Sequence, residues 1–400
     1  MLQLSGSFIR LEGLNPDGPF RYFRISTNPV LPISVARNAA FLCSGSHIPA
    51  GYAIYLAFEG GEAKLDSAPI GAARGILPAS ARYLDDGDIL RVQASKRTYR
   101  VVFRRDSYQQ SILLTERCNH YCLMCSQPPR DQQDDWLIEE AERLIAMLPR
   151  ETREIGLTGG EPTIYGERLI DLLRLTDRLL PFTAVHLLSN GRRFADQSFA
   201  EAYASVNHHD LMVGIPIYSD DPSRHNYIVQ ADKAFDETVA GILNLKRLRQ
   251  RVEIRVVIHA QSVDRLPKLA EFIARNLLFV DQVAFMGLEI TGFTRGNLKK
   301  LWIDPFDYRY VLEEAVEILA AYRVPVYVYN HQLCVVTNRV RKFCVSSISD
   351  WKNEYLPLCR SCDLRSECGG FFSSQVRYRH SDHIAAQHSK SERIAAEIVP

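Results

Sequence analysis

The spacing of apolar and polar positions changes near residue 108. Before that point, short apolar runs such as residues 52–58 and 89–93 are separated by turn residues, including Asp85-Asp86-Gly87-Asp88. Short apolar runs bounded by Gly, Asp and Pro are typical of strands in a small all-β domain. We therefore expect residues 1–108 to form a β-rich N-terminal domain, a small barrel or sandwich used as a scaffold or docking surface.

Strand-like runs alternate with helical periodicity between residues 109 and 300. In residues 137–148 the apolar side chains recur at i, i+4, i+7, i+8 and i+11, which marks one face of a helix. Six apolar runs have the length of strands: 111–115, 155–158, 184–188, 211–215, 252–258 and 283–286. This alternation predicts the fold class α/β, with parallel strands in a barrel or open sheet. In such barrels, the loops at the carboxyl ends of the strands build the active site.

Residues 301–400 form a third predicted unit. A helix near residues 308–322 precedes a strand at 324–329, and loops that carry cysteines follow. The tail from Ser381 is polar, with an amphipathic stretch near residues 394–398 to which we assign no role.

The composition excludes some classes of partner. The 400 residues carry a formal net charge of +1, so no chain-wide field attracts nucleic acid or an anionic membrane. No apolar run approaches the roughly 20 residues of a membrane helix, and the start has no signal-peptide pattern. We expect a soluble, cytoplasmic protein. In that compartment the nine cysteines, which fall mostly in two clusters, indicate metal sites rather than disulfides.

The first cluster is Cys118-x3-Cys122-x2-Cys125, in the loop after the first predicted barrel strand. Thiolates are soft ligands that bind zinc or iron–sulfur clusters. Three thiolates suit a cubane cluster with one iron left open to a small molecule, whereas a closed zinc site needs four ligands. A zinc site completed by His120 or another residue is the alternative.

The motif Thr158-Gly159-Gly160-Glu161-Pro162-Thr163 follows the second predicted strand. Paired glycines let a backbone approach a ligand closely, and a carboxylate beside them can hold an ammonium group. A strand-to-helix turn with a capping acid is the alternative. Together with the cysteine spacing, this motif resembles the radical S-adenosylmethionine superfamily, which implies an enzyme with a partial (β/α)6 barrel.

The resemblance assigns roles residue by residue. Cys118, Cys122 and Cys125 would bind a 4Fe–4S cluster whose fourth iron is chelated by the amino and carboxylate groups of S-adenosylmethionine. The amino group would be lined by Gly159, Gly160, Glu161 and Pro162. The reduced cluster would cleave the cofactor to a 5′-deoxyadenosyl radical that abstracts a substrate hydrogen. An electron donor such as flavodoxin or ferredoxin is implied.

Two further positions bear on the cofactor. Ser189-Asn190-Gly191, after the third strand, resembles the family's polar contact to the cofactor ribose, with an ordinary turn as the alternative. Met124 stands before the third cysteine, where the family usually has an aromatic residue. A methionine can still pack on adenine.

The second cysteine cluster includes Cys359-x2-Cys362-x5-Cys368. It resembles part of the SPASM or twitch extensions of radical enzymes that modify peptides. A full SPASM extension has a further cysteine where this chain has Phe372, so the resemblance implies one auxiliary cluster. We expect Cys334 as its fourth ligand, with Cys344 as the alternative. A structural zinc ribbon is the other interpretation.

A finer resemblance is to the C component of the His-Xaa-Ser system, over residues 85–385. It rests on four stretches: 114–129, 329–334, 347–355 and 368–372. It implies a peptide substrate with His-Xaa-Ser repeats, modified together with a partner radical maturase. The alternatives are a radical enzyme acting on a small molecule or nucleoside, and a non-catalytic iron–sulfur scaffold for a partner maturase.

Three other residues are weaker candidates. Asp220 and His225 lie after the fourth strand, where they could contact substrate or belong to a solvated loop. Arg255 alternates with apolar residues in the fifth strand, so it could face the barrel interior or make a structural ion pair.

Overall fold

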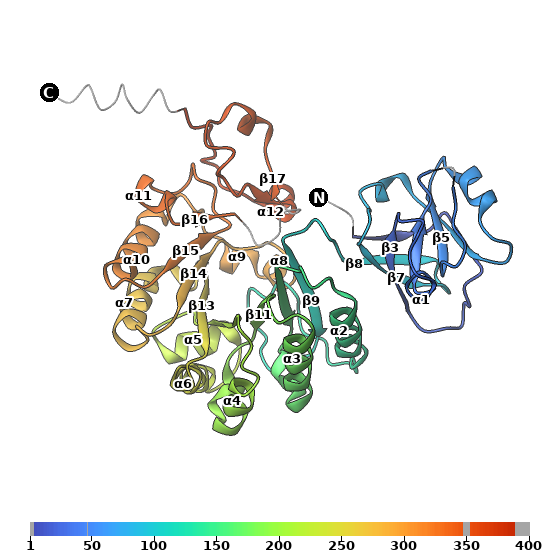
Figure 1. The fold of residues 1–400 in the computed structure, drawn as a ribbon. Coiled ribbons are helices and arrows are strands. Elements are labelled where there is room, and N and C mark those ends of the chain that lie inside the picture. The colour runs from blue at the N-terminus through green and yellow to red at the C-terminus, as the bar shows by residue number, and fades with distance from the viewer. Residues whose placement is uncertain (1–3, 46, 347–352, 389–400) are drawn as a thin grey trace. The chain divides into compact units, whose positions relative to one another are not determined.

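The computed structural model describes residues 4–45, 47–346 and 353–388 (Figure 1). The chain divides into two compact units, one of residues 2–110 with 147–152 and one of residues 111–146 with 153–400. The described residues from 301 onward belong to the same unit as the second sheet. Two segments from the sequence analysis, 347–352 and 394–398, lie outside the described residues.

The N-terminal unit is a mixed β-sheet. Its strands, in sheet order, are β1 (Ser5–Ser7), β8 (Thr98–Phe103), β7 (Ile89–Gln93), β3 (Arg21–Ser26), β4 (Ala39–Leu42), β5 (Ile54–Phe58), β6 (Ala73–Leu77) and β2 (Arg10–Glu12). Strands β3 to β6 pair in parallel, and the other pairs are antiparallel.

The two edge strands of this sheet belong to one extended segment, so the sheet closes on itself. β1 pairs with β8 and β2 pairs with β6, although the two strands are only two residues apart. Between them, the amide of Phe8 donates to the Arg97 carbonyl and that of Ile9 to the Ile76 carbonyl, both at 2.8 Å. The segment thus pairs on both sides, and the unit is a closed barrel.

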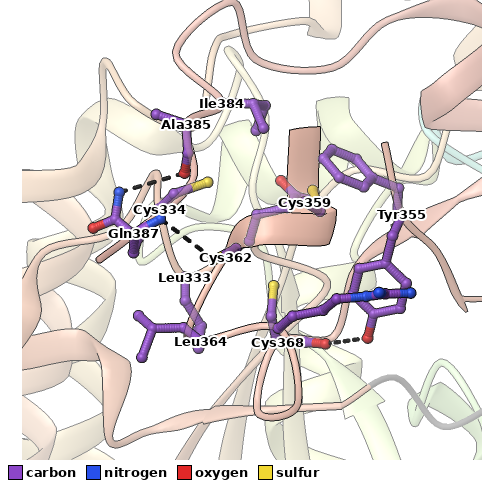
Figure 2. A pocket seen from close by; sticks show the side chains of 13 residues that line it. Leu333, Cys334, Tyr355, Cys359, Cys362, Leu364, Cys368, Ile384, Ala385 and Gln387 are labelled. Atoms are coloured by element: carbon purple, nitrogen blue, oxygen red, sulfur yellow. Dashed lines mark hydrogen bonds between the residues drawn. The ribbon is translucent and has the colours of Figure 1, made fainter. Parts of the chain in front are cut away.

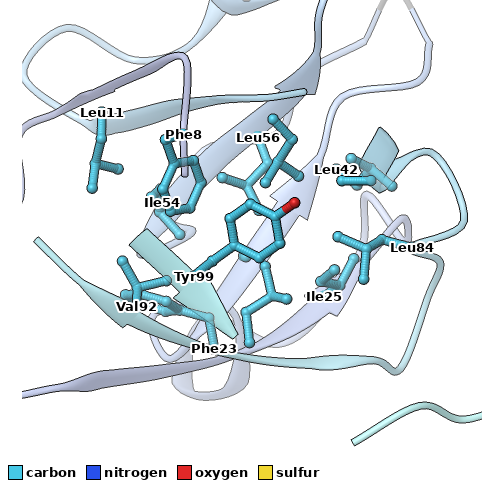
Figure 3. Close-up of a cluster of buried hydrophobic side chains, with 14 of the residues drawn as sticks. Phe8, Leu11, Phe23, Ile25, Leu42, Ile54, Leu56, Leu84, Val92 and Tyr99 are labelled. Atoms are coloured by element: carbon cyan, nitrogen blue, oxygen red, sulfur yellow. The ribbon is translucent and has the colours of Figure 1, made fainter. Parts of the chain in front are cut away.

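Alternation along the strands gives the barrel two apolar clusters. In β5, Ile54 and Leu56 belong to one cluster, while Tyr55 and Ala57 belong to the other. Successive side chains of a strand point to opposite faces, which is why neighbours separate in this way. Figure 3 shows the first cluster, in which Tyr99 packs among aliphatic side chains and Phe8. The second cluster includes Leu65, from the short helix η1 (Glu62–Ser67).

The second unit is built on an eight-stranded sheet whose strands follow one another in chain order. The strands are β9 (Gln109–Thr115), β10 (Glu154–Gly159), β11 (Ala184–Leu188), β12 (Leu211–Pro216), β13 (Arg251–Val257), β14 (Gln282–Met286), β15 (Val326–Tyr329) and β16 (Cys344–Val345). The pairs from β10 to β16 are parallel. The sheet therefore has two strands more than the six predicted, because β15 and β16 come from the region assigned to the extension.

Helices cover one face of this curled sheet (Figure 1). They are α2 (Trp136–Met147), α3 (Glu167–Leu179), α4 (Gln197–Ala204), α5 (Pro222–Val229), α6 (Ala234–Arg247), α7 (Leu266–Asn276) and α10 (Arg309–Ala321). In β10 the buried residues are Ile155 and Leu157, and in β11 they are Val185 and Leu187. Their alternation leaves the opposite face of each strand toward the barrel interior.

The described residues after β16 form short elements. A two-stranded antiparallel sheet joins β17 (Asn353–Glu354) to β18 (Phe371–Phe372), and α12 (Ser373–Tyr378) follows. Among the residues described, no helix is long and apolar enough to cross a membrane.

The packing of α6 gives a test of the barrel. Gly241 of α6 faces the short helix η4 (Arg192–Ala195). A Cβ at Gly241 would lie 2.2 Å from the Gly191 carbonyl oxygen. We expect Gly241→Ala to lower the free energy of unfolding by about 1–3 kcal/mol, even though alanine favours helix by roughly 1 kcal/mol. Thermal unfolding of the purified protein measures this.

The control is Gly296→Ala, in α8 (Phe293–Gly296), because an added Cβ there meets nothing within 4 Å. Equal unfolding temperatures for the two variants would contradict close packing of α6 on η4.

Candidate functional site

The loop after β9 carries Cys118, Cys122 and Cys125, and the loop after β10 runs beside it. The amide of Gly160 donates to the Thr115 carbonyl and that of Glu161 to the Arg117 carbonyl, both at 2.8 Å. A Cβ at Gly160 would lie 2.1 Å from the Arg117 carbonyl oxygen. The glycines of the motif are therefore required by this close approach of two backbones, which brings the motif to the first cysteine.

Glu161 connects the loops after β10 and β11. Its carboxylate is buried and accepts hydrogen bonds from the Thr163 amide (3.0 Å), the Thr163 hydroxyl (2.6 Å), the Ser189 hydroxyl (2.8 Å) and the Asn190 amide (2.6 Å). Burial raises the pKa of this carboxyl, and the hydrogen bonds oppose that shift. Glu161 is thus held by donors of this chain, and its contact with a cofactor amino group stays a prediction.

Asn190 extends this network to the cysteine loop. Its side-chain NH2 donates to the side-chain oxygen Oδ1 of Asn119 at 2.6 Å, and its backbone carbonyl accepts from the Thr238 hydroxyl at 2.9 Å. Pro162 is buried at the start of the short helix η3 (Pro162–Tyr165). The residues predicted from three separate motifs therefore meet at the carboxyl ends of β9, β10 and β11.

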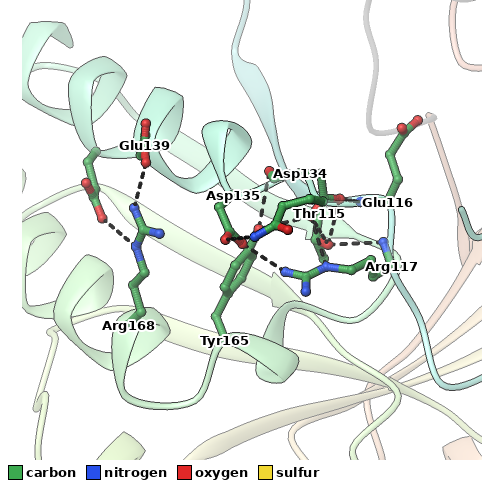
Figure 4. Close-up of polar contacts among 10 residues, drawn as sticks. Thr115, Glu116, Arg117, Asp134, Asp135, Glu139, Tyr165 and Arg168 are labelled. Atoms are coloured by element: carbon green, nitrogen blue, oxygen red, sulfur yellow. Dashed lines mark hydrogen bonds and ion pairs between the residues drawn. The ribbon is translucent and has the colours of Figure 1, made fainter. Parts of the chain in front are cut away.

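A buried carboxylate that the sequence analysis did not identify fixes the start of the cysteine loop. Asp134 accepts hydrogen bonds from the Thr115 hydroxyl (2.9 Å), the Glu116 amide (2.5 Å) and the Nε of Arg117 (3.0 Å). Figure 4 shows these bonds together with Tyr165, whose hydroxyl lies 3.2 Å from the same carboxylate. Asp134 thus ties the residue before Cys118 to the start of α2 and to η3.

The middle of the cysteine loop is paired with α5. The amide of Tyr121 donates to the Val229 carbonyl (3.1 Å) and that of Leu123 to the Ile228 carbonyl (2.9 Å). α5 begins at Pro222, and the carboxylate of Asp221 caps it by accepting from the Arg224 amide. The cap and the pairing hold Cys122 against the end of this helix.

The end of the loop is bound by the segment after β14. The amide of Phe293 donates to the Cys125 carbonyl at 2.8 Å, and the Thr294 hydroxyl donates to the Met124 carbonyl at 3.0 Å. Asn297 donates to the Leu123 carbonyl at 2.9 Å. These residues were not identified from the sequence, although Gly292, with φ of +52°, marks a turn there.

The three thiols lie in a largely apolar setting. Burial raises the pKa of Cys118 to about 12 and also raises the pKa values of Cys122 and Cys125. Cys122 packs against an apolar cluster that includes Met124 and Tyr218. Thiolates here need a bound cation to balance their charge, which suits metal ligation. A contact between Met124 and adenine stays a prediction.

Three thiols are the donor set that a cubane cluster with one open iron needs. In the parts of the chain that the structure describes, no group of three His, Cys, Asp or Glu side chains converges to hold one metal ion. Both ring nitrogens of His120 are buried and have no hydrogen-bond partner. A cubane offers each thiolate a different iron, so its ligands need not share one point.

The weaker candidates have structural partners. Asp220 pairs with both Nε and Nη2 of Arg265, at 2.8 and 2.5 Å. His225 is buried, accepts from the Tyr218 amide at 3.2 Å, and has its pKa lowered to about 4 by burial. Neither side chain is thereby placed in contact with a substrate.

Arg255 faces the barrel interior. Its Nη1 donates to the Glu253 carboxylate at 2.6 Å and its Nη2 to the Met286 sulfur at 3.2 Å. A Cβ at Gly214 would lie 2.9 Å from the Arg255 Cδ and 3.0 Å from the His186 Nε2. Because Gly214 has no side chain, the barrel interior has room for the side chains of Arg255 and His186.

Four cysteines of the C-terminal region line one pocket (Figure 2). Its lining includes Cys334, Cys359, Cys362 and Cys368. Cys344 is not among the lining residues, and its thiol lies 3.7 Å from the Val340 carbonyl oxygen. The four cysteines that line the pocket are those expected for an auxiliary site.

The hydrogen bonds that Asp134 accepts can be tested by substitution. Asp134→Ala leaves Arg117 and the Glu116 amide without their buried acceptor, so we expect a cost of about 3–5 kcal/mol in the free energy of unfolding. We also expect less iron per chain after anaerobic reconstitution, because the loop that begins at Cys118 loses its anchor. Thermal unfolding and iron analysis measure the two effects.

The matched control is Asp135→Ala. Asp135 also pairs with Arg117, at 3.1 Å, but its side chain is 40% exposed, so we expect a loss of at most about 1 kcal/mol. If both variants bind iron and unfold alike, Asp134 does not position the loop.

Comparisons with known proteins agree with this geometry. Residues 112–273 match the model of the Radical SAM superfamily. The structure of anSMEcpe with bound AdoMet is similar in fold, with a TM-score of 0.50 and 14% identity over 72% of this chain and 94% of that one. Streptococcus suis SuiB bound to S-adenosylmethionine gives a TM-score of 0.47 and 16% identity over 64% of this chain. The chain spans 54% of the length of SuiB. Residues 112–273 thus match the superfamily's model, while the likeness to anSMEcpe concerns the fold.

Proposed function

We propose that the chain reductively cleaves S-adenosylmethionine at a 4Fe–4S cluster and uses the resulting 5′-deoxyadenosyl radical to modify a peptide. The observation that carries the first part is the meeting of three motifs at the carboxyl ends of β9, β10 and β11. There, the cysteine loop, Gly160-Glu161 and Ser189-Asn190 form one hydrogen-bonded network. The match of this region to the Radical SAM superfamily supports an enzyme of that chemistry.

Cys118, Cys122 and Cys125 would hold the cluster. Iron would compensate the burial that raises the pKa values of these thiols. A cluster held by these thiolates would provide the electron for breaking the sulfonium bond of S-adenosylmethionine. The chain's own contribution is to orient the ligands: the close approach at Gly160 and the bonds from Phe293 and Thr294 fix both ends of the loop.

Arg255 would bind a carboxylate inside the barrel. Its charge is shared with Glu253, yet its Nη2 meets only the weakly accepting sulfur of Met286. Arginine binds carboxylates through two donors at once, so this side chain is suited to the methionine carboxylate of the cofactor.

The peptide substrate rests on the resemblance of four sequence stretches to the C component of the His-Xaa-Ser system. On that basis we propose a peptide with His-Xaa-Ser repeats, a partner radical maturase and an electron donor such as flavodoxin or ferredoxin. SuiB has been solved bound to its precursor peptide SuiA, and anSMEcpe with a Cp18Cys peptide. Their likeness to this chain concerns the fold alone.

We also propose one auxiliary 4Fe–4S cluster, bound by Cys334, Cys359, Cys362 and Cys368. All four line one pocket, which favours Cys334 over Cys344 as the fourth ligand. Four thiolates would complete the coordination of such a cluster.

The initiating site is tested by anaerobic reconstitution, reduction with dithionite and assay of 5′-deoxyadenosine. We expect product from the wild type and none from Cys122→Ala, because that variant lacks one of three cluster ligands. Cys43→Ala is the control, since Cys43 lies buried in the N-terminal barrel and should leave product formation unchanged. A fully loaded wild type that forms no product, even with peptide and partner maturase, would favour a non-catalytic scaffold.

The auxiliary site is tested by iron content. Two 4Fe–4S clusters would give about eight iron atoms per wild-type chain, and one cluster about four. We expect Cys334→Ala to fall toward about four and Cys344→Ala to stay near the wild-type value. The reverse result would assign Cys344 as the ligand, and no change in either variant would argue against a cluster in this pocket.

A further inference from the structure

The auxiliary pocket is closed by a segment that none of the motifs predicted. Residues 381–388, which we name the C-terminal strap, follow the last cysteine by more than ten residues. Three of them, Ile384, Ala385 and Gln387, line the pocket together with the four cysteines. Figure 2 shows Ile384 and Ala385 across the pocket from Cys368.

The first half of the strap is anchored to the segment before α10. The amide of Asp382 donates to the Asp304 carboxylate at 3.1 Å. The ring of His383 stacks on Phe306, with centroids 4.0 Å apart and an interplanar angle of 14°. Arg309 covers the same phenylalanine. These contacts fix where the strap begins its path over the pocket.

Gln387 is held at both its side chain and its backbone. Its side-chain oxygen accepts from the Arg341 guanidinium at 2.7 Å, and its carbonyl accepts from the Asp363 amide at 2.9 Å. With these two contacts in place, the amide of Gln387 donates to the Cys362 sulfur at 3.4 Å. An N–H donor is therefore held against one of the proposed cluster ligands.

The strap thus provides a backbone N–H donor to the sulfur of Cys362. Such bonds stabilise negative charge on sulfur, and the reduced cluster carries one more negative charge than the oxidised one.

We propose that the C-terminal strap raises the reduction potential of the auxiliary cluster through the Gln387 N–H bond to Cys362. The inference rests on the auxiliary cluster proposed above. Gln387 is a positioning residue: its side chain fixes the backbone, and the backbone amide acts on the ligand. Hydrogen bonds to sulfur are among the factors that set the potential of an iron–sulfur cluster.

The test compares two substitutions at one position. Gln387→Pro removes the N–H, whereas Gln387→Ala keeps it and removes only the side chain. Both are made in full-length protein carrying Cys118→Ala, Cys122→Ala and Cys125→Ala, so that the auxiliary cluster is the remaining signal. An EPR-monitored redox titration measures its potential. We expect the potential of Gln387→Pro to be lower than that of the parent, and that of Gln387→Ala to lie closer to the parent.

Equal potentials for the proline and alanine variants would overturn the inference. If the proline variant loses its cluster, the parent protein is compared in H2O and after exchange into D2O. A hyperfine coupling to a proton that disappears on exchange supports the bond, and the absence of such a coupling overturns the inference. Absence of iron from the triple-cysteine parent would instead refute the auxiliary cluster itself. That result would not bear on the initiating site, which the 5′-deoxyadenosine assay tests separately.

Discussion

The contact on which the site depends is the approach of the β10 loop to the carbonyl of Arg117. It leaves no space for a Cβ at Gly160, where an added carbon would sit 2.1 Å from that oxygen. Because the two backbones meet so closely, Glu161 reaches the loop after β11, and Asn190 reaches back to Asn119. Three loops are therefore positioned by one steric requirement, and a side chain there would separate them.

The cysteine loop lies in a largely apolar environment with one ion pair at its start. Cys122 and its neighbours lie among apolar side chains, and burial lowers the pKa of His120 to about 3. At the start of the loop, the Asp134 carboxylate forms an ion pair with the Arg117 guanidinium at 3.0 Å. An environment that disfavours isolated charge strengthens every electrostatic contact made within it. The packing around the loop and the ion pair, whose carboxylate is fully buried, both hold the loop in place.

Local patterns predicted most of the fold but only part of the site. The strand at 184–188 was located correctly, because alternate burial leaves a mark in the sequence. The number of strands in the sheet was underestimated. β16 has two residues, too few to show any periodicity, and it is recognised as a strand only by its pairing with β15. Asp134 resembles an ordinary acid near a helix start, yet its partners come from two other loops. Thr294 contacts Met124 across 170 positions, which no local motif records.

The closed N-terminal barrel has a consequence for molecular recognition. Peptides are often bound by adding a strand to an exposed sheet edge, where backbone groups are free to pair. Residues 5–7 pair with β8 and residues 10–12 pair with β6, so one segment covers both strands and leaves little edge for such an addition. If this unit reads a peptide, it must do so through side chains or loops. Recognition would then depend on the identity of particular residues rather than on the extended shape of the bound chain.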